Sequence, residues 1–117
     1  MVEIIRRKEQ YTDSIISNLR GGKGDLLRKD IFSEDEMHNK VDWCVTLTIP
    51  DGHSIGEHPH GPDAEIYYIL SGSVRVTDAG ITEDLTAGDC VFTGGGAIHS
   101  LENVSGQESM VLAIKIK

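Results

Sequence analysis

The stretch His58-Pro59-His60-Gly61-Pro62-Asp63-Ala64-Glu65 decides how this chain is interpreted. Two histidines separated by one residue project from the same face of a β-strand, which is a geometry that chelates one ion. Glu65 lies five residues after His60 and would face the opposite side of a perfectly regular strand. Gly61-Pro62 supplies the loop or bulge that can restore the register. Together with His99, much further along, these side chains predict one metal site assembled from two stretches of sequence.

From Val41 onward the sequence has the pattern of an all-β protein. Apolar residues occupy every second position from Val41 to Ile49, which predicts a half-buried strand that ends at the turn Pro50-Asp51-Gly52. Further strands are expected where short apolar runs are bounded by turns: Glu65–Leu70, Val74–Thr77, Ile81–Leu85, Cys90–Thr93, Ile98–Glu102 and Met110–Ile116. About eight strands at this spacing predict an antiparallel sandwich or barrel.

The predicted strand at Glu65–Leu70 is apolar enough to be covered on both faces. Tyr67 would share the face of Glu65 and is the candidate for a residue that lines the pocket or supports the ligands. It is also the one candidate for a catalytic residue, and no other catalytic residue is identified from the sequence. A core aromatic residue with a satisfied hydroxyl is the alternative interpretation. Three polar residues beside the ligand loop are candidates for proton donors at the mouth, or are simply solvated: His53, Glu57 and Asp63.

With these spacings the chain resembles the cupin superfamily, and in particular its small, single-domain, metal-binding bacterial members. The first cupin motif is matched by Gly52, His58, His60, Glu65 and Gly72. The second is matched by Gly88, Gly96, His99 and Asn103, with Gly94 where the family has proline. The resemblance covers about residues 41–117 and implies a double-stranded β-helix, or jelly-roll barrel, that encloses an ion held by His58, His60, Glu65 and His99. Glycine at position 94 indicates a tight turn, a mobile loop at Gly94–Ala97, or a close approach of substrate.

Three neutral imidazoles and one carboxylate suit a borderline divalent metal better than calcium or magnesium, which prefer oxygen ligands alone. Manganese or iron is favoured, and zinc, nickel and cobalt fit the same donor set. Four facial ligands on an octahedral ion would leave two positions open for water, dioxygen or a substrate.

The length and the net charge of the chain exclude several classes of protein. The 117 residues suit one domain, and no apolar run is long enough to cross a membrane. Residues 1–40 hold eight basic and eight acidic side chains, whereas residues 41–117 hold three and eleven and so carry the whole net charge of −8. An acidic body repels nucleic acid and anionic lipid. The start of the chain has no secretion signal, and we expect a cytoplasmic protein.

Residues 1–40 have a weaker pattern and are expected to form an extension that packs on a barrel formed by residues 41–117. A short strand is predicted near residues 2–5, helical turns after Thr12, and a short strand over Leu26–Arg28 and Ile31–Phe32. Because small cupins commonly form dimers, we expect a homodimer in which this extension covers open sheet edges.

The favoured function is a metal-dependent enzyme that acts on a small organic substrate, with oxygenase-like or decarboxylase-like chemistry. The alternative is a cupin that binds or senses a metal or a small ligand without catalysis. A sugar-phosphate substrate is disfavoured, because it would need Arg20, Lys23 or Arg28 to fold over the barrel mouth.

Overall fold

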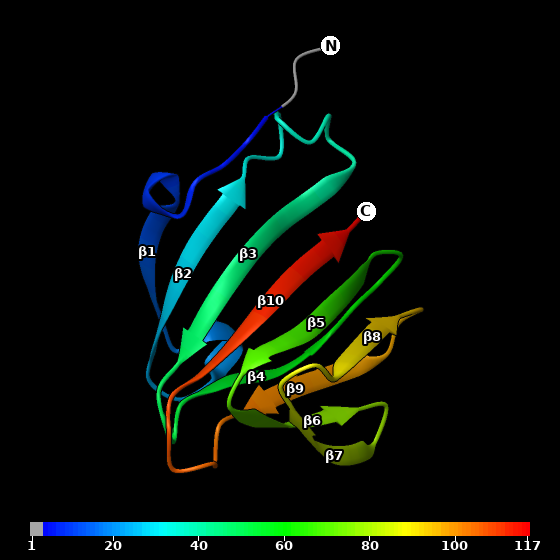
Figure 1. Cartoon of the computed structure of the whole chain (residues 1–117). Coiled ribbons are helices and arrows are strands. Elements are labelled where there is room, and N and C mark those ends of the chain that lie inside the picture. The colour runs from blue at the N-terminus through cyan, green and yellow to red at the C-terminus, as the bar shows by residue number, and fades with distance from the viewer. Residues whose placement is uncertain (1–3) are drawn as a thin grey trace.

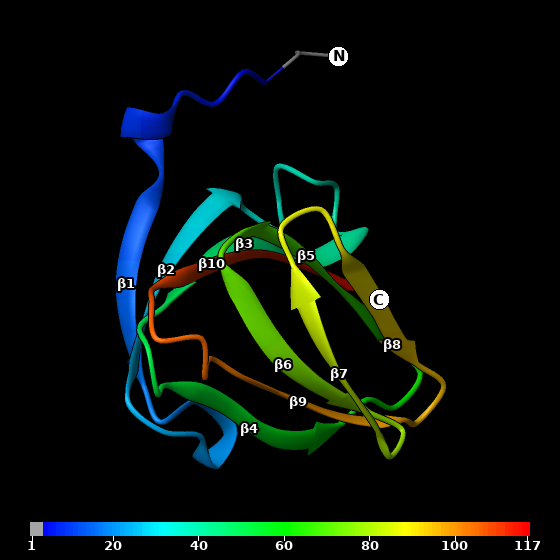
Figure 2. The same cartoon turned by 60° about the horizontal axis from the view of Figure 1, so that its bottom comes forward.

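The computed structural model describes residues 4–117 as two antiparallel β-sheets that pack face to face (Figures 1 and 2). This confirms the predicted all-β fold. The strands are β1 (Thr12–Ser17), β2 (Asp25–Phe32), β3 (Val41–Ile49), β4 (Ser54–Pro59), β5 (Ala64–Ser71), β6 (Ser73–Asp78), β7 (Ile81–Thr86), β8 (Cys90–Gly94), β9 (Ile98–Glu102) and β10 (Ser109–Ile116). Two 3₁₀ turns, η1 (Lys8–Gln10) and η2 (Leu19–Gly21), precede and follow β1.

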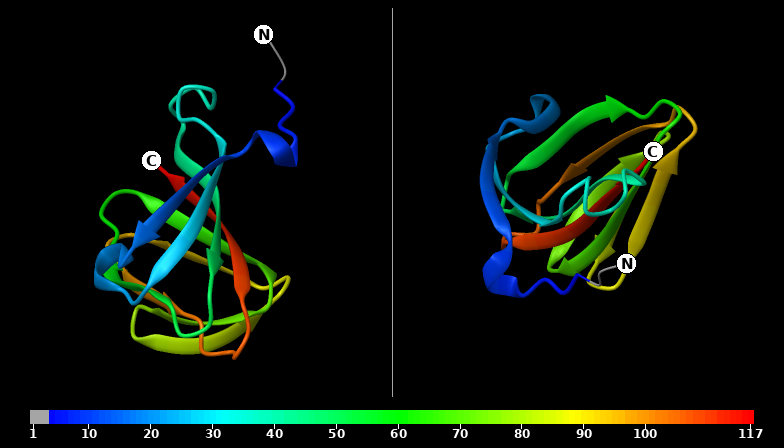
Figure 3. Two further views of the ribbon diagram at one scale, coloured as in Figure 1. Left: turned by 90° about the vertical axis from the view of Figure 1, so that its left-hand side faces the viewer. Right: turned by 90° about the horizontal axis from the view of Figure 1, so that it is seen from above.

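The strand order shows the jelly-roll connectivity of the barrel. Six strands form one sheet in the order β1-β2-β3-β10-β5-β8, and four form the other in the order β4-β9-β6-β7. β1 and β8 are the opposite edges of the larger sheet (Figure 3). Between residues 4 and 117, no helix has the length and apolar character needed to span a membrane.

The core lies between the two sheets and follows the alternation of the strands. Inward residues of the larger sheet include Val45, Leu47 and Ile69, and those of the smaller sheet include Ile55 and Leu101; each is at most 5% exposed. Alternate residues of a strand point to opposite faces, so one apolar face per strand is enough to form this layer. The core fills one part of the space between the sheets, and the histidine cluster occupies another.

The N-terminal segment differs from the sequence prediction. Residues Thr12–Ser17 form a strand rather than helical turns, and they pair with β2 from Thr12↔Asp30 to Ser17↔Asp25. The β-branched residues of this segment favour a strand once β2 offers an unpaired edge. Ile4 and Ile5 lie outside any strand, and the rest of the strand predicted at residues 2–5 falls outside the described residues.

Two further predictions are changed by the structure. Asp25–Phe32 is one continuous strand of eight residues that joins the extension to β3. The outer face of β5 is open in the single chain, since Tyr68 and Leu70 are each 41% exposed. The prediction that this strand is covered on both faces is therefore wrong for one copy of the chain.

Gly94 is the last residue of β8 and pairs with Ala64 on β5. A side chain at this position would place its Cβ 3.0 Å from the Cβ of Ala64. The close approach that requires glycine is thus to Ala64. The turn follows at Gly95 and Gly96, where φ is 65° and 83°.

Two glycines let η2 lie directly against β4. A Cβ on Gly56 would lie 2.0 Å from the carbonyl oxygen of Arg20, and a Cβ on Gly22 would lie 2.3 Å from that of Ser54. The backbones are also joined by a hydrogen bond of 2.9 Å from the Ser54 N–H to the Lys23 carbonyl. This contact fixes the loop of the extension beside the strand that carries His58.

We predict that Gly56→Ala separates η2 from β4. The added methyl group would meet backbone atoms, which have little room to move, so the fold should lose about 1–3 kcal/mol of stability. Urea unfolding measures this change as a lower midpoint. Gly61→Ala is the matched control, since nothing lies within 4 Å of a Cβ at that position; an equal loss in both variants would contradict the proposed contact.

Candidate metal centre

The four predicted ligands come together from both sheets. His58 lies on β4, and its cross-strand partner on β9 is His99. His60 directly follows β4, while Glu65 lies on β5 in the larger sheet. Each of the four side chains is at most 7% exposed. The cluster is therefore buried between the sheets.

The potential donor atoms of these residues converge on one point. Nε2 of His99 lies 2.8 Å from Nε2 of His58 and 2.9 Å from Nε2 of His60. Oε1 of Glu65 lies 3.3 Å from His60 Nε2 and 3.4 Å from His99 Nε2. Adjacent donors on an octahedral ion with bonds of about 2.1 Å are about 3.0 Å apart, so these separations fit a single ion.

The far nitrogens of His58 and His60 are held by acceptors. Nδ1 of His58 donates to the carbonyl oxygen of Gly56 at 2.8 Å. Nδ1 of His60 donates to Oδ2 of Asp63 at 3.0 Å. In a neutral imidazole the only N–H is then on Nδ1, and Nε2 presents a lone pair to the cluster.

His99 is oriented in the same way through a short relay. The Thr93 hydroxyl donates to Oδ2 of Asp78 at 3.1 Å, so its oxygen accepts the Nδ1–H of His99 at 3.0 Å. All three Nε2 atoms are consequently free of protons, although they lie close together. Three facing lone pairs and a carboxylate oxygen repel one another unless a cation lies between them, and this donor set fits a divalent transition metal.

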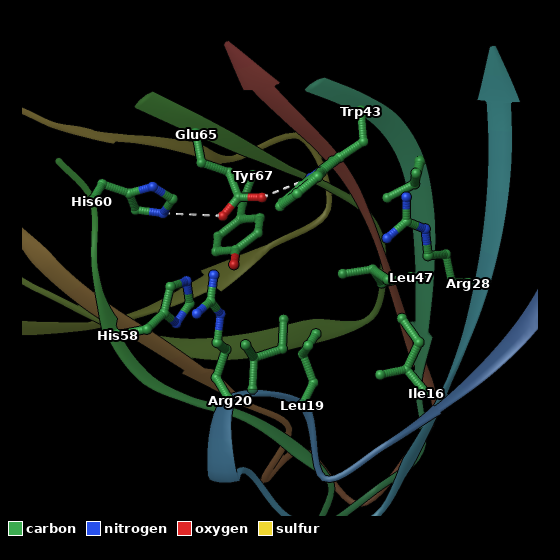
Figure 4. A pocket seen from close by; sticks show the side chains of 12 residues that line it. Ile16, Leu19, Arg20, Arg28, Trp43, Leu47, His58, His60, Glu65 and Tyr67 are labelled. Atoms are coloured by element: carbon green, nitrogen blue, oxygen red, sulfur yellow. Dashed lines mark hydrogen bonds and ion pairs between the residues drawn. The ribbon is translucent and has the colours of Figure 1, made fainter. Parts of the chain in front are cut away.

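Glu65 is oriented by its neighbours so that one oxygen faces the histidines. Its Oε2 accepts a hydrogen bond of 3.0 Å from Trp43 Nε1, which leaves Oε1 towards His60 and His99 (Figure 4). Burial alone would raise the pKa of Glu65, but its polar contacts with His99 and Trp43 outweigh it and leave the pKa lowered. The Tyr67 ring stacks on His99 with centroids 5.0 Å apart, as expected for a residue on the ligand face.

Lys115 lies behind two of the ligands. On the larger sheet it is the cross-strand partner of both Trp43 and Glu65. Its Nζ contacts Oδ2 of Asp63 at 2.8 Å, the same oxygen that accepts from His60, and it lies 5.0 Å above the Trp43 ring. One ammonium group therefore supports His60 through Asp63 and Glu65 through Trp43.

A pocket of about 60 Å³ opens onto the cluster. This volume holds a few water molecules or a ligand with similarly few non-hydrogen atoms. His58, His60, Glu65 and Tyr67 form its inner end (Figure 4). The remaining walls are apolar or cationic, and they consist of Ile16, Leu19, Arg20, Arg28, Trp43, Val45, Leu47 and Ile55.

The two arginines of the pocket have different surroundings. Arg28 on β2 donates to Asp30 at 2.7 Å, and its guanidinium lies 5.5 Å from the Trp43 ring. Arg20 on η2 has no carboxylate within 4.0 Å among residues 4–117. Figure 4 shows the Arg20 guanidinium pointing into the pocket between His58 and Tyr67. The sequence analysis disfavoured a sugar-phosphate substrate unless Arg20, Lys23 or Arg28 folds over the barrel mouth. Arg20 and Arg28 do line the pocket, whereas Lys23 lines a separate surface groove.

The jelly-roll fold and the buried His-His-Glu-His cluster define a cupin with a possible metal site. Residues 45–115 match the family described as Cupin domain, and the chain belongs to that family. Arg20, Arg28 and Trp43 precede the matched segment.

The sequence comparison and the structure comparison both give a relative whose name refers to oxalate. The chain is 38% identical over 113 residues to an oxalate-binding protein from Thermotoga maritima, which covers 97% of this chain and 93% of the relative. A crystal structure of a predicted oxalate decarboxylase from the same organism is also 38% identical, with a TM-score of 0.92 over 97% of this chain and 98% of that one. An RmlC-like cupin from Shewanella frigidimarina, 20% identical with a TM-score of 0.76 over 98% and 91% of the two chains, shares the fold.

The candidates for proton donors have other roles in the structure. Asp63 orients His60, and Nδ1 of His53 contacts the carbonyl oxygen of Asp25 at 2.7 Å, away from the cluster. Glu57 is exposed and does not line the pocket. Sequence reasoning missed Trp43, Thr93 and Lys115 as supports of the ligands. Only the inward position of Lys115 at the end of an otherwise apolar strand could have indicated its role.

We predict that His58→Ala abolishes stoichiometric metal and that Glu65→Gln weakens metal binding by about 10- to 100-fold. The first variant removes a donor, and the second replaces an anionic oxygen by a neutral one. Elemental analysis after purification and equilibrium dialysis measure the two effects. Wild-type metal content in the His58→Ala protein would contradict the site.

We also predict that Lys115→Met lowers metal affinity by about 10-fold, because His60 and Glu65 would lose a shared support. The absorption spectrum of the cobalt(II) form should shift in this variant, since the ligand field depends on how the donors are held. Lys117→Met is the control, because Lys117 pairs with Glu34 and Asp42 and does not contact Asp63 or Trp43. An unchanged cobalt spectrum in Lys115→Met would argue against this role.

Proposed function

We propose that this cupin binds one divalent transition metal ion through His58, His60, Glu65 and His99, and that a small carboxylate anion of the oxalate type binds to that ion. Manganese or iron is the favoured metal, with zinc, nickel and cobalt as alternatives. One observation carries the proposal: proton-free imidazole nitrogens and a carboxylate oxygen converge at the end of a small pocket that two arginines line. The oxalate-related names found in the sequence comparison and in the structure comparison support the choice of anion.

The pocket is cationic in a protein that is otherwise acidic. The chain has a net charge of −8, so an anion is repelled by the protein as a whole, whereas the two arginines of the pocket attract it. When bound, the ion would supply Lewis acidity and open positions for an oxygen ligand. The residues of the chain supply the rest: Leu19, Leu47 and Ile55 limit the size of the ligand, and burial of the inner end excludes water.

The pocket favours binding over decarboxylation. Decarboxylation replaces a carbon–carbon bond by a carbon–hydrogen bond and requires a proton donor at the substrate. Among residues 4–117, Glu65 is the only carboxylic acid that lines the pocket, and it belongs to the candidate metal ligands. The other acidic group there is the Tyr67 hydroxyl, and burial raises its pKa well above the ordinary value, which makes it a weak proton donor. The binding function that the sequence offered as an alternative is therefore the proposed one. Oxygenase-like and decarboxylase-like turnover become outcomes of the test.

The homodimer remains a prediction. The outer face of the larger sheet carries Tyr68, Leu70 and Phe92, which are 41%, 41% and 62% exposed, and it is the surface on which we expect a second copy to pack.

We predict that the manganese(II)-loaded protein binds oxalate with a stoichiometry of about one, whereas the metal-free protein does not. The reason is that the ion neutralises the cluster and leaves positive charge for the anion. Anaerobic calorimetric titration of both forms measures binding. Formate and carbon dioxide assays, with an oxygen electrode, follow turnover in the same samples. Equal oxalate binding by the metal-free protein would contradict the proposal. Steady formation of formate would show that the function is decarboxylation and not binding alone.

A further inference from the structure

We infer that Arg20 makes the pocket selective for short dicarboxylates over monocarboxylates, by binding the second acid group of a ligand whose first acid group is at the metal. This inference rests on the proposed function and specifies the class of ligand. It assigns the selectivity to η2, in the N-terminal extension, which precedes the segment that matches the cupin family.

Charge balance is the first argument. A divalent ion held by three neutral imidazoles and Glu65 has a net charge of about +1 at the cluster, which one carboxylate neutralises. The Arg28 charge is already balanced by Asp30, at 2.7 Å. Arg20 keeps an unbalanced positive charge that points into the same pocket. A monocarboxylate at the ion would leave this charge unpaired, whereas a dianion would balance both.

The chemistry of the side chain is the second argument. A guanidinium presents its N–H groups as a planar fork that matches the two oxygens of a carboxylate, and it keeps its charge at all physiological pH values. Arg20 is an exposed residue on η2 whose guanidinium reaches into the pocket beside His58 and Tyr67, so a ligand bound at the candidate metal ligands can also contact the guanidinium (Figure 4). The pocket volume of about 60 Å³ restricts such a ligand to a very short one, with few or no atoms between its acid groups.

The backbone at Arg20 is the third argument. Arg20 has φ 55° and ψ 33°, a left-handed conformation that residues with a Cβ rarely adopt. It is held there by hydrogen bonds that flank it, from Gly21 N–H to Asn18 and from Gly22 N–H to Leu19, and by the contact of Gly22 with β4. Glycine would adopt this conformation without strain. A long cationic side chain at a strained position, held rigidly beside a pocket, indicates a requirement for that side chain.

The test compares oxalate with acetate and glyoxylate, which each carry one carboxylate, by calorimetric titration of the manganese(II)-loaded protein. The wild type should bind oxalate at least 10-fold more tightly than either monocarboxylate. Arg20→Gln should weaken oxalate binding by about 10- to 100-fold and change monocarboxylate binding little, because one charged bidentate contact is lost. Arg20→Lys should bind oxalate with an affinity between those of the wild type and Arg20→Gln, since lysine keeps the charge but lacks the planar fork of N–H groups.

Lys23→Gln is the matched control, because it removes the same charge from the same loop outside the pocket. It should leave the oxalate preference unchanged. Manganese content and the urea midpoint are measured for every variant, so a folding defect is recognised directly. Arg20→Gly should raise the midpoint by relieving the left-handed strain and should lose the preference like Arg20→Gln.

The outcomes separate the two proposals. If the metal-loaded wild type binds none of the three anions, the proposed function fails and the inference fails with it. If it binds all three with similar affinity, or if Arg20→Gln weakens all three equally, the selectivity assigned to Arg20 is overturned and metal-dependent carboxylate binding stands.

Discussion

The repulsion between three proton-free imidazole nitrogens is the constraint on which the rest of the structure depends. Nε2 atoms 2.8 and 2.9 Å apart, with no proton between them, are unfavourable neighbours in a buried space. Each ring could relieve the repulsion by moving its proton to Nε2, but Gly56, Asp63 and Thr93 each hold that proton on Nδ1. A bound cation converts the same arrangement from a cost into a source of stability, and because the donors come from both sheets it also links the two layers.

The register of the larger sheet builds much of the support for this cluster. Trp43, Lys115 and Glu65 are neighbours across β3, β10 and β5, so a shift of one residue in either pairing would turn the lysine or the carboxylate to the outer face. One oxygen of Asp63 then accepts the hydrogen bond from His60 and also pairs with the ammonium group of Lys115. The register of the strands therefore fixes both their pairing and the orientation of the ligands. A substitution that weakens the pairing is expected to weaken the hold on the ligands as well.

Much of the fold and the cluster could be predicted from the sequence, because both are encoded by local spacing. The alternation from Val41 to Ile49 predicts β3, and the hairpin around Ala79 predicts β6 and β7. The spacing of His58 and His60, on either side of one proline, predicts half of the cluster. Pairings that depend on distant segments could not be predicted. The helical turns expected after Thr12 are a strand because β2 provides an edge, and Arg20 enters the pocket because Gly22 and Gly56 let two backbones touch. No periodicity in residues 1–40 encodes either contact.

The barrel and the N-terminal extension contribute different properties to the site. The barrel brings together donors that suit many ions and many oxygen ligands, and so gives little selectivity of its own. Selectivity needs a group that penalises the wrong ligand, and an unpaired guanidinium does this, because its charge stays unbalanced unless a second acid group reaches it. Because Arg20 is carried by a short turn outside the segment that matches the family, this property could change through a few substitutions near η2 while the ligand set stays the same. Cupins with identical metal ligands are therefore expected to differ most in what their N-terminal segments place at the mouth.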